Sequence, residues 1–346
     1  MKRRLLPGAL LVALALGVGF VAVRRAIRGL AQPLPLRAVL VYRLLPGESL
    51  GEVATDLHRR GILAAPHTWA WYARWRGEAR ALRAGEYELR PGLTADGLLE
   101  KFVKGEVLLR SFTIIDGWRV TDLLAALRRD RYIVTTLPPK PVDLMAKFSA
   151  AGLSPEGQFL PETYEFARGT SDIALLGRAH RALQRVLNAA WKSRAAHLPL
   201  HDERELLILA SIVEKESALP GERRKIAGVY LHRLSIGMRL QADPTVIYGL
   251  GDRYDGHLHA VDLRTDGAFN TYTRAGLPPT PIDLPGAAAI EASARPQITD
   301  ALYFVASGRT DGRHVFSATL AEQNAAVRRY LARMRRRAAR GKRAHP

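Results

Sequence analysis

The sequence contains no cysteine, which excludes disulfides, thiolate catalysis and zinc sites built on cysteine. It also has no P-loop, no Gly-x-Ser-x-Gly turn and no His-Glu-x-x-His helix, the motifs typical of nucleotide-binding proteins, serine hydrolases and zinc proteases. One close pair of histidines, His257 and His259, has no third ligand in view. The sequence therefore predicts neither a metal nor a cofactor.

Acidic side chains are outnumbered by basic ones, 33 against 52, and the formal net charge is +19. Part of this excess lies at the C-terminus, because residues 328–346 include nine Lys or Arg and no Asp or Glu. Such a segment is able to bind nucleic acid, anionic lipid or an acidic polymer. It lacks the regular aromatic interleaving of single-strand binders, so we expect no nucleic-acid partner and interpret residues 332–346 as a solvated, basic tail.

Charge is missing from one long stretch near the N-terminus. Residues 5–23 contain no charged side chain, and as a helix they would extend about 28 Å, close to the thickness of the hydrocarbon core of a bilayer. No small-x-small cleavage site precedes Arg24 and Arg25. We therefore predict an uncleaved single-pass membrane anchor within residues 1–30, while the similar charges on its two sides do not fix its orientation.

The remaining chain has the composition of a globular protein, with 47% hydrophobic and 25% charged residues overall. After a proline-containing linker over residues 31–38, residues 39–106 twice show the order strand, Pro-Gly turn and helix. Ser49 is expected to cap the first of these helices and Gly61 to end it. This order predicts a small α+β module. Residues 107–331 alternate helices with loops rich in Gly and Pro, which predicts a larger mixed α/β domain and an α+β chain overall.

Several elements of the larger domain are marked in detail. A Thr-x-x-Glu capping box at Thr319 and Glu322 opens the last helix. The four prolines within residues 275–286 exclude regular structure and predict a stiff loop that lines a functional surface. The helices expected before this loop cover residues 120–128, 173–187, 204–217 and 222–234.

Two glutamates, Glu214 and Glu216, end an expected helix whose residues 206–213 are uncharged. On a helical wheel the apolar side chains surround the axis, and their weak resultant points to the side that Glu216 shares. Glu214 lies about 200° away around the axis, so the two carboxylates cannot act as a facing pair. Because desolvation raises the pKa of a carboxyl group, Glu216 is predicted as a proton donor near neutral pH. Its pairing with a nearby arginine is the structural alternative.

The segment around Glu216 carries a specific resemblance. It reads ILASIVEKESALPGERRKIAGVYLHRLSIGMRLQADPTVIYGLG, and further matches are EGQFLPETYEF, AFNTYTRAGLPPTPIDLPG and ALYFVASGRTDGRHVFSATLAEQN. On these four ordered blocks, the sequence resembles the YceG-like endolytic murein transglycosylases over most of residues 1–331. The resemblance implies that residues 39–106 form a LysM-like subdomain and that residues 107–331 form the YceG-like catalytic domain.

The resemblance also implies an activity, a lyase that cleaves MurNAc–GlcNAc bonds within peptidoglycan strands. The second glutamate of the Glu-Lys-Glu motif, Glu216, is catalytic in such a protein. As an acid it donates a proton to the glycosidic oxygen, and as a carboxylate it takes the proton of the C6 hydroxyl, which attacks C1. The product ends in 1,6-anhydroMurNAc, and the role implied is to terminate elongation of nascent strands.

Other residues of the matched blocks are expected to bind the substrate. Polar and aromatic side chains of this kind hold sugars. Loop fixation is the alternative for Gln241, Asp243, Asn270 and Tyr272, and capping of a helix is the alternative for Glu162. If the enzyme were instead a hydrolytic muramidase, Asp243 would be the second carboxylate. The expected substrate-binding residues are Ser217, Gln241, Asp243, Asn270, Tyr272 and Glu162.

The family resemblance completes the expectations about location and partners. It places the main body on the periplasmic or outer side of the inner membrane, with peptidoglycan strands as substrate and peptidoglycan synthases as partners. A non-catalytic scaffold that only binds peptidoglycan is the remaining alternative. It predicts binding to sacculi without release of fragments.

Overall fold

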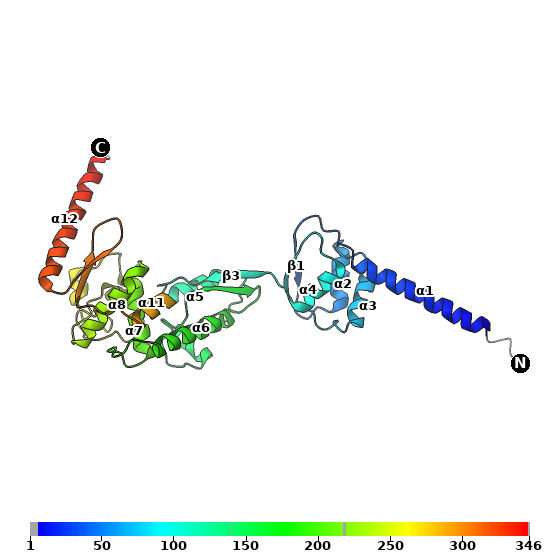
Figure 1. The fold of residues 1–346 in the computed structure, drawn as a ribbon, viewed down its shortest axis with the longest axis horizontal. Coiled ribbons are helices and arrows are strands. Elements are labelled where there is room, and N and C mark those ends of the chain that lie inside the picture. The colour runs from blue at the N-terminus through cyan, green and yellow to red at the C-terminus, as the bar shows by residue number, and fades with distance from the viewer. Residues whose placement is uncertain (1–5, 139, 217–218, 345–346) are drawn as a thin grey trace. The chain divides into compact units, whose positions relative to one another are not determined.

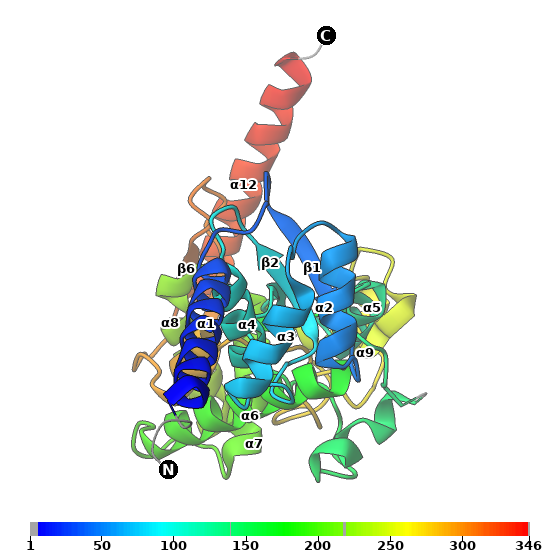
Figure 2. The same cartoon turned by 90° about the vertical axis from the view of Figure 1, so that its right-hand side faces the viewer.

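The computed structural model describes residues 6–138, 140–216 and 219–344 (Figures 1 and 2). The chain divides into two compact units. The small unit comprises the chain up to Arg110 together with Glu165–Thr170, and the large unit comprises Ser111–Tyr164 together with the chain from Ser171 onward. The division lies close to the predicted boundary at residue 106.

The small unit is an α+β module built around one antiparallel pair of strands. Strands β1 and β2 pair with Tyr42 opposite Tyr87, and both rings contact Phe102 of α4 in the buried core. The indole N–H of the buried Trp69 donates to the Ala95 carbonyl, 2.8 Å away. The elements are α1 (Leu6–Leu30), β1 (Leu40–Leu44), α2 (Leu50–Arg59), α3 (Pro66–Trp75), β2 (Gly85–Leu89) and α4 (Ala95–Lys104).

Local sequence signals define the first turn-and-helix piece as predicted. The side chain of Ser49 accepts from the Glu52 N–H while the Glu52 carboxylate accepts from the Ser49 N–H, so the two form a capping box at the start of α2. Beyond the end of α2, Gly61 adopts a positive φ of 71°, the left-handed conformation that a non-glycine residue rarely takes. Both sequence predictions are confirmed.

The N-terminal helix α1 continues past the uncharged residues 5–23 into the core of the small unit. Leu30 and Leu34 are buried in the same cluster as α3 and α4, and the Leu34 N–H donates to the Leu93 carbonyl. The predicted linker 31–38 is thus packed against the unit at Leu34. Among the described residues, none form a helix that is both long and apolar enough to cross a membrane. The predicted anchor begins at Leu5, which lies outside the described residues.

The large unit is mainly helical, with its core around α7 and α11. Helix α11 contacts α6, α7 and α8, and Figure 1 shows it beside α7 and α8. Strands β3 (Leu109–Thr113) and β4 (Thr163–Ala167) each have residues in both units. The other elements of the large unit are α5 (Val120–Arg129), α6 (Asp172–Lys192), α7 (Glu203–Glu216), α8 (Pro220–Ser235), α9 (Asp243–Leu250), α10 (Ala260–Arg264), α11 (Ala287–Ala294), β5 (Tyr303–Ala306), β6 (His314–Ser317) and α12 (Leu320–Ala344), with short 3-10 turns at Pro141–Asp143, Met145–Phe148 and Gly251–Arg253.

The four helices predicted before the proline-rich loop are all present, with bounds that differ by a few residues. Two short strands near the end of the chain, β5 and β6, pair antiparallel. The capping box at Thr319 and Glu322 is formed by reciprocal hydrogen bonds and precedes α12. The mixed helical and strand architecture expected for the large domain is therefore confirmed.

Helix α7 is buried along its length, as its uncharged sequence predicts. Every side chain from Leu206 to Val213 lies in the interior. The proline-rich loop crosses α7, since the Ile282 N–H donates to the Ser211 hydroxyl and the Gly286 N–H donates to the Glu214 carboxylate. A buried helix therefore presents its C-terminal glutamates from a rigid base.

Candidate active site

Glu216 is the last residue of α7, and its carboxyl group is held by the next helix. The hydroxyl of Tyr230 on α8 donates to Glu216 Oε1 at 2.5 Å. Burial raises the pKa of Glu216 to about 7, and the negative charge of Asp243 acts in the same direction. The Tyr230 hydrogen bond and the Arg233 charge lower this pKa in part. Glu216 is therefore substantially protonated near neutral pH, as a general acid must be.

Tyr230 is held rigidly behind this carboxyl group. Only 1% of it is exposed, and its ring packs edge-on against Phe304 of β5, with centroids 5.8 Å apart. Burial and the nearby carboxylate raise its own pKa well above the ordinary value for tyrosine, so the hydroxyl keeps its proton and acts as a donor. No local sequence pattern predicts that Tyr230 contacts Glu216, because this contact depends on how α7 and α8 pack.

Arg233 lies one turn further along α8 and is fixed by backbone carbonyls. Its guanidinium donates to the carbonyls of Leu302, at 2.6 Å, and Leu240, at 2.5 Å, and lies over the Tyr303 ring at 5.3 Å. Arg233 and Glu216 form no ion pair within the described part of the chain. The simple Glu216–arginine pair considered as a structural alternative is thus not what holds this carboxyl group.

A second carboxylate faces the same network from α9. Asp243 is the first residue of α9, and its Oδ1 accepts a 2.5 Å hydrogen bond from the hydroxyl of Tyr272. Burial and the hydrogen bond to Asp243 raise the pKa of Tyr272. The charges of Asp243, Tyr272 and Glu216 influence one another, so α7, α8, α9 and the 270–274 turn bring together two tyrosine–carboxylate pairs.

Comparison with known protein families assigns the chain to one of them. A model of the YceG-like family matches residues 42–329. The chain belongs to the YceG-like family. The match covers both units, including every described residue of the two tyrosine–carboxylate pairs.

Individual relatives agree with this assignment. The chain is 29% identical over 308 residues to the endolytic murein transglycosylase of Bacillus subtilis (strain 168), covering 82% of this chain and 83% of the relative. It is 28% identical over 295 residues to the protein of the same name from Streptococcus pneumoniae serotype 2, covering 75% of this chain and 53% of that protein. A crystal structure of a putative YceG-like protein from Listeria monocytogenes is similar with a TM-score of 0.50 and 27% identity, covering 84% of this chain and 99% of that one.

The other glutamate of the family motif, Glu214, has a different environment. Its Oε1 accepts from Arg223 at 2.7 Å and its Oε2 from the Gly286 N–H at 3.1 Å, and only 5% of its side chain is exposed. Burial raises its pKa, and the Arg223 charge opposes this. Glu214 and Glu216 thus have separate partners, as the helical wheel predicts, and Glu214 has a structural role.

A further buried glutamate, Glu156, has a pKa that burial raises to about 7. One of its oxygens accepts from the Val120 N–H at 2.9 Å and the other from the Tyr248 hydroxyl at 3.1 Å. Only 3% of it is exposed. Glu156 lies outside the Glu-Lys-Glu motif and is held through both carboxyl oxygens, so we assign it a structural role, whereas Glu216 lies in the motif beside the charge of Asp243 and remains the candidate.

Three expected binding residues occupy the loops near Asp243. Gln241 is exposed and adopts a φ of 50°, with its N–H bonded to the Thr271 carbonyl. Asn270 is buried, and its amide donates to the carbonyls of Asp262, Leu263 and Thr265 while its oxygen accepts from the Tyr272 N–H. These contacts are those of the loop-fixing alternative for Asn270. The Tyr272 hydroxyl points instead to Asp243.

The two remaining expected residues lie elsewhere. Glu162 is exposed, and its carbonyl accepts from the Ile114 N–H just before β4 begins. Ser217 lies outside the described residues. The structure brings Glu216, Asp243 and Tyr272 into one network, and leaves the binding roles of Gln241, Asn270, Glu162 and Ser217 as predictions.

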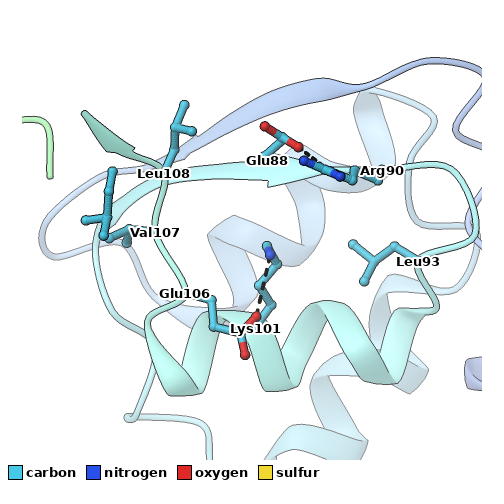
Figure 3. A pocket seen from close by; sticks show the side chains of 8 residues that line it. Glu88, Arg90, Leu93, Lys101, Glu106, Val107 and Leu108 are labelled. Atoms are coloured by element: carbon cyan, nitrogen blue, oxygen red, sulfur yellow. Dashed lines mark hydrogen bonds and ion pairs between the residues drawn. The ribbon is translucent and has the colours of Figure 1, made fainter. Parts of the chain in front are cut away.

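The small unit has a pocket of its own, of about 540 Å³. Figure 3 shows its acidic side chains turned to cations: Glu88 pairs with Arg90, and Glu106 pairs with Lys101 at 3.5 Å. Aliphatic side chains, among them Leu93 and Val107, complete the lining. Both carboxylates are ion-paired here, whereas the Glu216 carboxyl group of the large unit is held by a tyrosine hydroxyl.

Proposed function

We propose that this chain is an endolytic murein transglycosylase that cleaves MurNAc–GlcNAc bonds inside peptidoglycan strands. The observation that carries the proposal is the carboxyl group of Glu216, which lies at the end of a buried helix beside the charge of Asp243 and has a pKa raised to about 7. The Bacillus and Streptococcus relatives bear the name of this activity. The motif residue that the family resemblance implies is therefore also the residue with the environment of a general acid.

In the proposed reaction, protonated Glu216 donates its proton to the oxygen that links MurNAc to GlcNAc, and that bond breaks. The resulting carboxylate takes the proton of the C6 hydroxyl of the same MurNAc, and O6 forms a bond to C1. The glutamate regains its proton, and the strand ends in 1,6-anhydroMurNAc without any water consumed. One carboxyl group is sufficient, in contrast to glycoside hydrolysis with its two carboxyl groups.

The neighbours of Glu216 support this cycle. Tyr230 fixes one carboxyl oxygen, and the charge of Asp243 helps Glu216 to keep its proton. Asp243 and Tyr272 would line the sugar site, with Gln241, Ser217, Asn270 and Glu162 as further contacts. A hydrolytic muramidase with Asp243 as second carboxylate, or a scaffold that binds without cutting, would use the same surface.

The deciding experiment treats purified peptidoglycan with the full chain and analyses the products by mass spectrometry. A transglycosylase yields anhydro ends, lighter by one water than the reducing ends of a muramidase. Glu216→Gln should remove all products while strand binding persists, and Glu214→Gln is the matched variant that should still release anhydro ends. Inactivity of Glu214→Gln together with an active Glu216→Gln would refute the assignment.

The location follows from the same proposal. Residues 5–23 would anchor the chain in the inner membrane once, with both units on the periplasmic side where peptidoglycan lies, and residues 39–106 would act as a LysM-like subdomain. Peptidoglycan synthases would be partners, and the cut would end nascent strands. Resistance to extraction by alkaline carbonate, combined with digestion of both units by protease added from the periplasmic side, tests the topology.

A further inference from the structure

Two exposed tryptophans lie side by side on the small unit. Trp71 and Trp75 of α3 are 43% and 67% exposed, and their indoles stack with centroids 6.3 Å apart at an angle of 10°. The Tyr72 ring lies 6.0 Å from Trp75. Single exposed apolar side chains are ordinary on protein surfaces, but a contiguous cluster of large aromatic rings marks an interaction surface. We call Trp71, Tyr72 and Trp75 the aromatic face.

Of the aromatic face, Tyr72 is half-buried and packs against the core, whereas Trp71 and Trp75 are exposed. The third tryptophan of α3, Trp69, is fully buried, bonds the Ala95 carbonyl and packs against Phe102. Ala70 and Ala73 complete the core side of the helix. Helix α3 therefore has one side that folds the unit and another that is free to bind.

The aromatic face lies next to the N-terminal helix. Helices α1 and α3 are in contact, and Figure 1 shows the C-terminal end of α1 near α3. Thr68 lines a hollow of about 290 Å³ together with Arg25 and Gly29 of α1. Trp71 and Trp75 follow Thr68 at the spacing i+3 and i+7, which places them on the same stripe of α3. The face is thus on the side of α3 that borders α1.

The charges around this border are mostly positive. The acidic Glu78 and Asp96 are both ion-paired with Arg76, at 2.9 and 2.8 Å. The exposed arginines on α1 and around α3 are Arg24, Arg25, Arg28, Arg74 and Arg80. Basic side chains beside Trp and Tyr are typical of protein segments at the headgroup level of a bilayer, where anionic lipids attract the charge and the amphipathic rings fit the interface.

The length of α1 determines how far the aromatic face lies from the hydrocarbon core of the bilayer. If residues 5–23 occupy the hydrocarbon core, α1 extends roughly 10 Å further before Leu30 enters the core of the small unit. The headgroup layer on one side of a bilayer is about 5–8 Å thick. Leu30 therefore lies just beyond this layer, whereas Arg25, about 3 Å past residue 23, lies within it. Because Arg25 and Thr68 line the same hollow, that part of α3 is at the height of the headgroups.

We propose that the aromatic face inserts into the headgroup layer of the membrane from which α1 emerges, and so fixes the small unit against the bilayer. This placement rests on the membrane anchor of the proposed function. The occupant of the face is anionic lipid, and a sugar stacked on the indoles is the competing occupant.

The test uses the full chain reconstituted in vesicles of phosphatidylcholine and phosphatidylglycerol. Tryptophan fluorescence is compared between vesicles with ordinary lipid and vesicles with bromine on the acyl chains near the headgroup, which quenches indoles at that depth. Strong quenching is expected, and the double variant Trp71→Gln/Trp75→Gln should lose most of it. Trp191→Phe is the matched control in the large unit, where the indole lies under Arg194 at 3.9 Å, and it should keep the quenching.

The outcomes separate the two proposals. If alkaline carbonate extracts the chain from the vesicles, the anchor is refuted and this placement with it. A chain that resists extraction but whose quenching does not depend on Trp71 and Trp75 refutes the placement alone. The same holds if soluble peptidoglycan fragments, and not lipid, change the emission of these two indoles.

Discussion

The hydroxyl of Tyr230 on α8 donates to Oε1 of Glu216 on α7 at 2.5 Å. This contact ties the orientation of the proposed acid to a buried residue that packs on β5. Because Oε1 accepts this hydrogen bond, the proton of the neutral acid is favoured on Oε2. Tyr230 therefore controls both the position and the proton affinity of the group.

Tyr230→Phe should move the pH dependence of cleavage in one direction. A donated hydrogen bond stabilises the carboxylate, so its loss raises the pKa of Glu216 above about 7. Since the acid must be protonated, the alkaline limb of kcat/KM should shift to higher pH. Tyr164→Phe is the control, because it removes a buried hydroxyl that bonds the Leu160 carbonyl. An alkaline limb that stays in place or moves to lower pH would contradict the role given to Tyr230.

Asp243→Asn should shift the same limb the opposite way. The negative charge of Asp243 raises the pKa of Glu216, and the amide oxygen of asparagine still accepts from Tyr272. Without that charge Glu216 loses its proton at lower pH, and the alkaline limb of kcat/KM moves down. The products should keep their anhydro ends. If the variant instead stops all bond cleavage while the wild type releases reducing ends, Asp243 is the second carboxylate of a muramidase.

Much of this site could be predicted from the sequence because the relevant signals are local. The helical period alone separates Glu216 from Glu214 around the axis of α7, and the structure gives each its own partners. Capping boxes are predictable for the same reason, because the hydroxyls of Ser49 and Thr319 each accept from the backbone N–H of the residue three positions later. Such signals need only the geometry of one turn.

Features that join distant segments were not accessible in this way. Tyr230 reaches Glu216 through the packing of two helices, and the buried acid Asp283 lies at 0% exposure beside Lys215 only because the proline-rich loop crosses α7. Burial raises the pKa of Asp283, and its carboxyl oxygens have no hydrogen-bond partner within the described part of the chain. Asn270 shows the same limit, because the residue type alone does not indicate whether the amide faces a sugar or its own loop.

Glu216→Gln should stabilise the protein at neutral and alkaline pH. Folded Glu216 keeps its proton up to about pH 7, whereas an unfolded glutamate releases it near its ordinary pKa of 4.5. Stability therefore falls as pH rises between these values, because the unfolded state binds fewer protons there. Glutamine does not titrate, so the variant should gain at most about 3 kcal/mol at pH 8 and nothing at pH 4. Thermal unfolding at both pH values measures this, with the exposed Glu291→Gln as a control that should show no such difference.

Gly228→Ala should disrupt the packing that positions Tyr230 and Arg233. Gly228 lies on α8 where the helix meets the chain after α11, and a Cβ atom there would lie 2.2 Å from the Gln297 carbonyl oxygen. That segment is held to α8, because the Gln297 N–H donates to the Arg224 carbonyl at 2.9 Å. Two backbones in contact cannot separate without moving α8, so we expect a loss of about 2 kcal/mol or more in unfolding free energy and reduced cleavage.

The matched control for this substitution lies in the same helix. Gly221 has no atom within 4 Å of the position of a Cβ, so Gly221→Ala should leave the unfolding free energy unchanged or raise it by up to about 1 kcal/mol through helix propensity. Thermal unfolding of both variants, with product analysis at one pH, measures the difference. Equal stability and activity of the two would show that the close approach of α8 to Gln297 does not constrain the site.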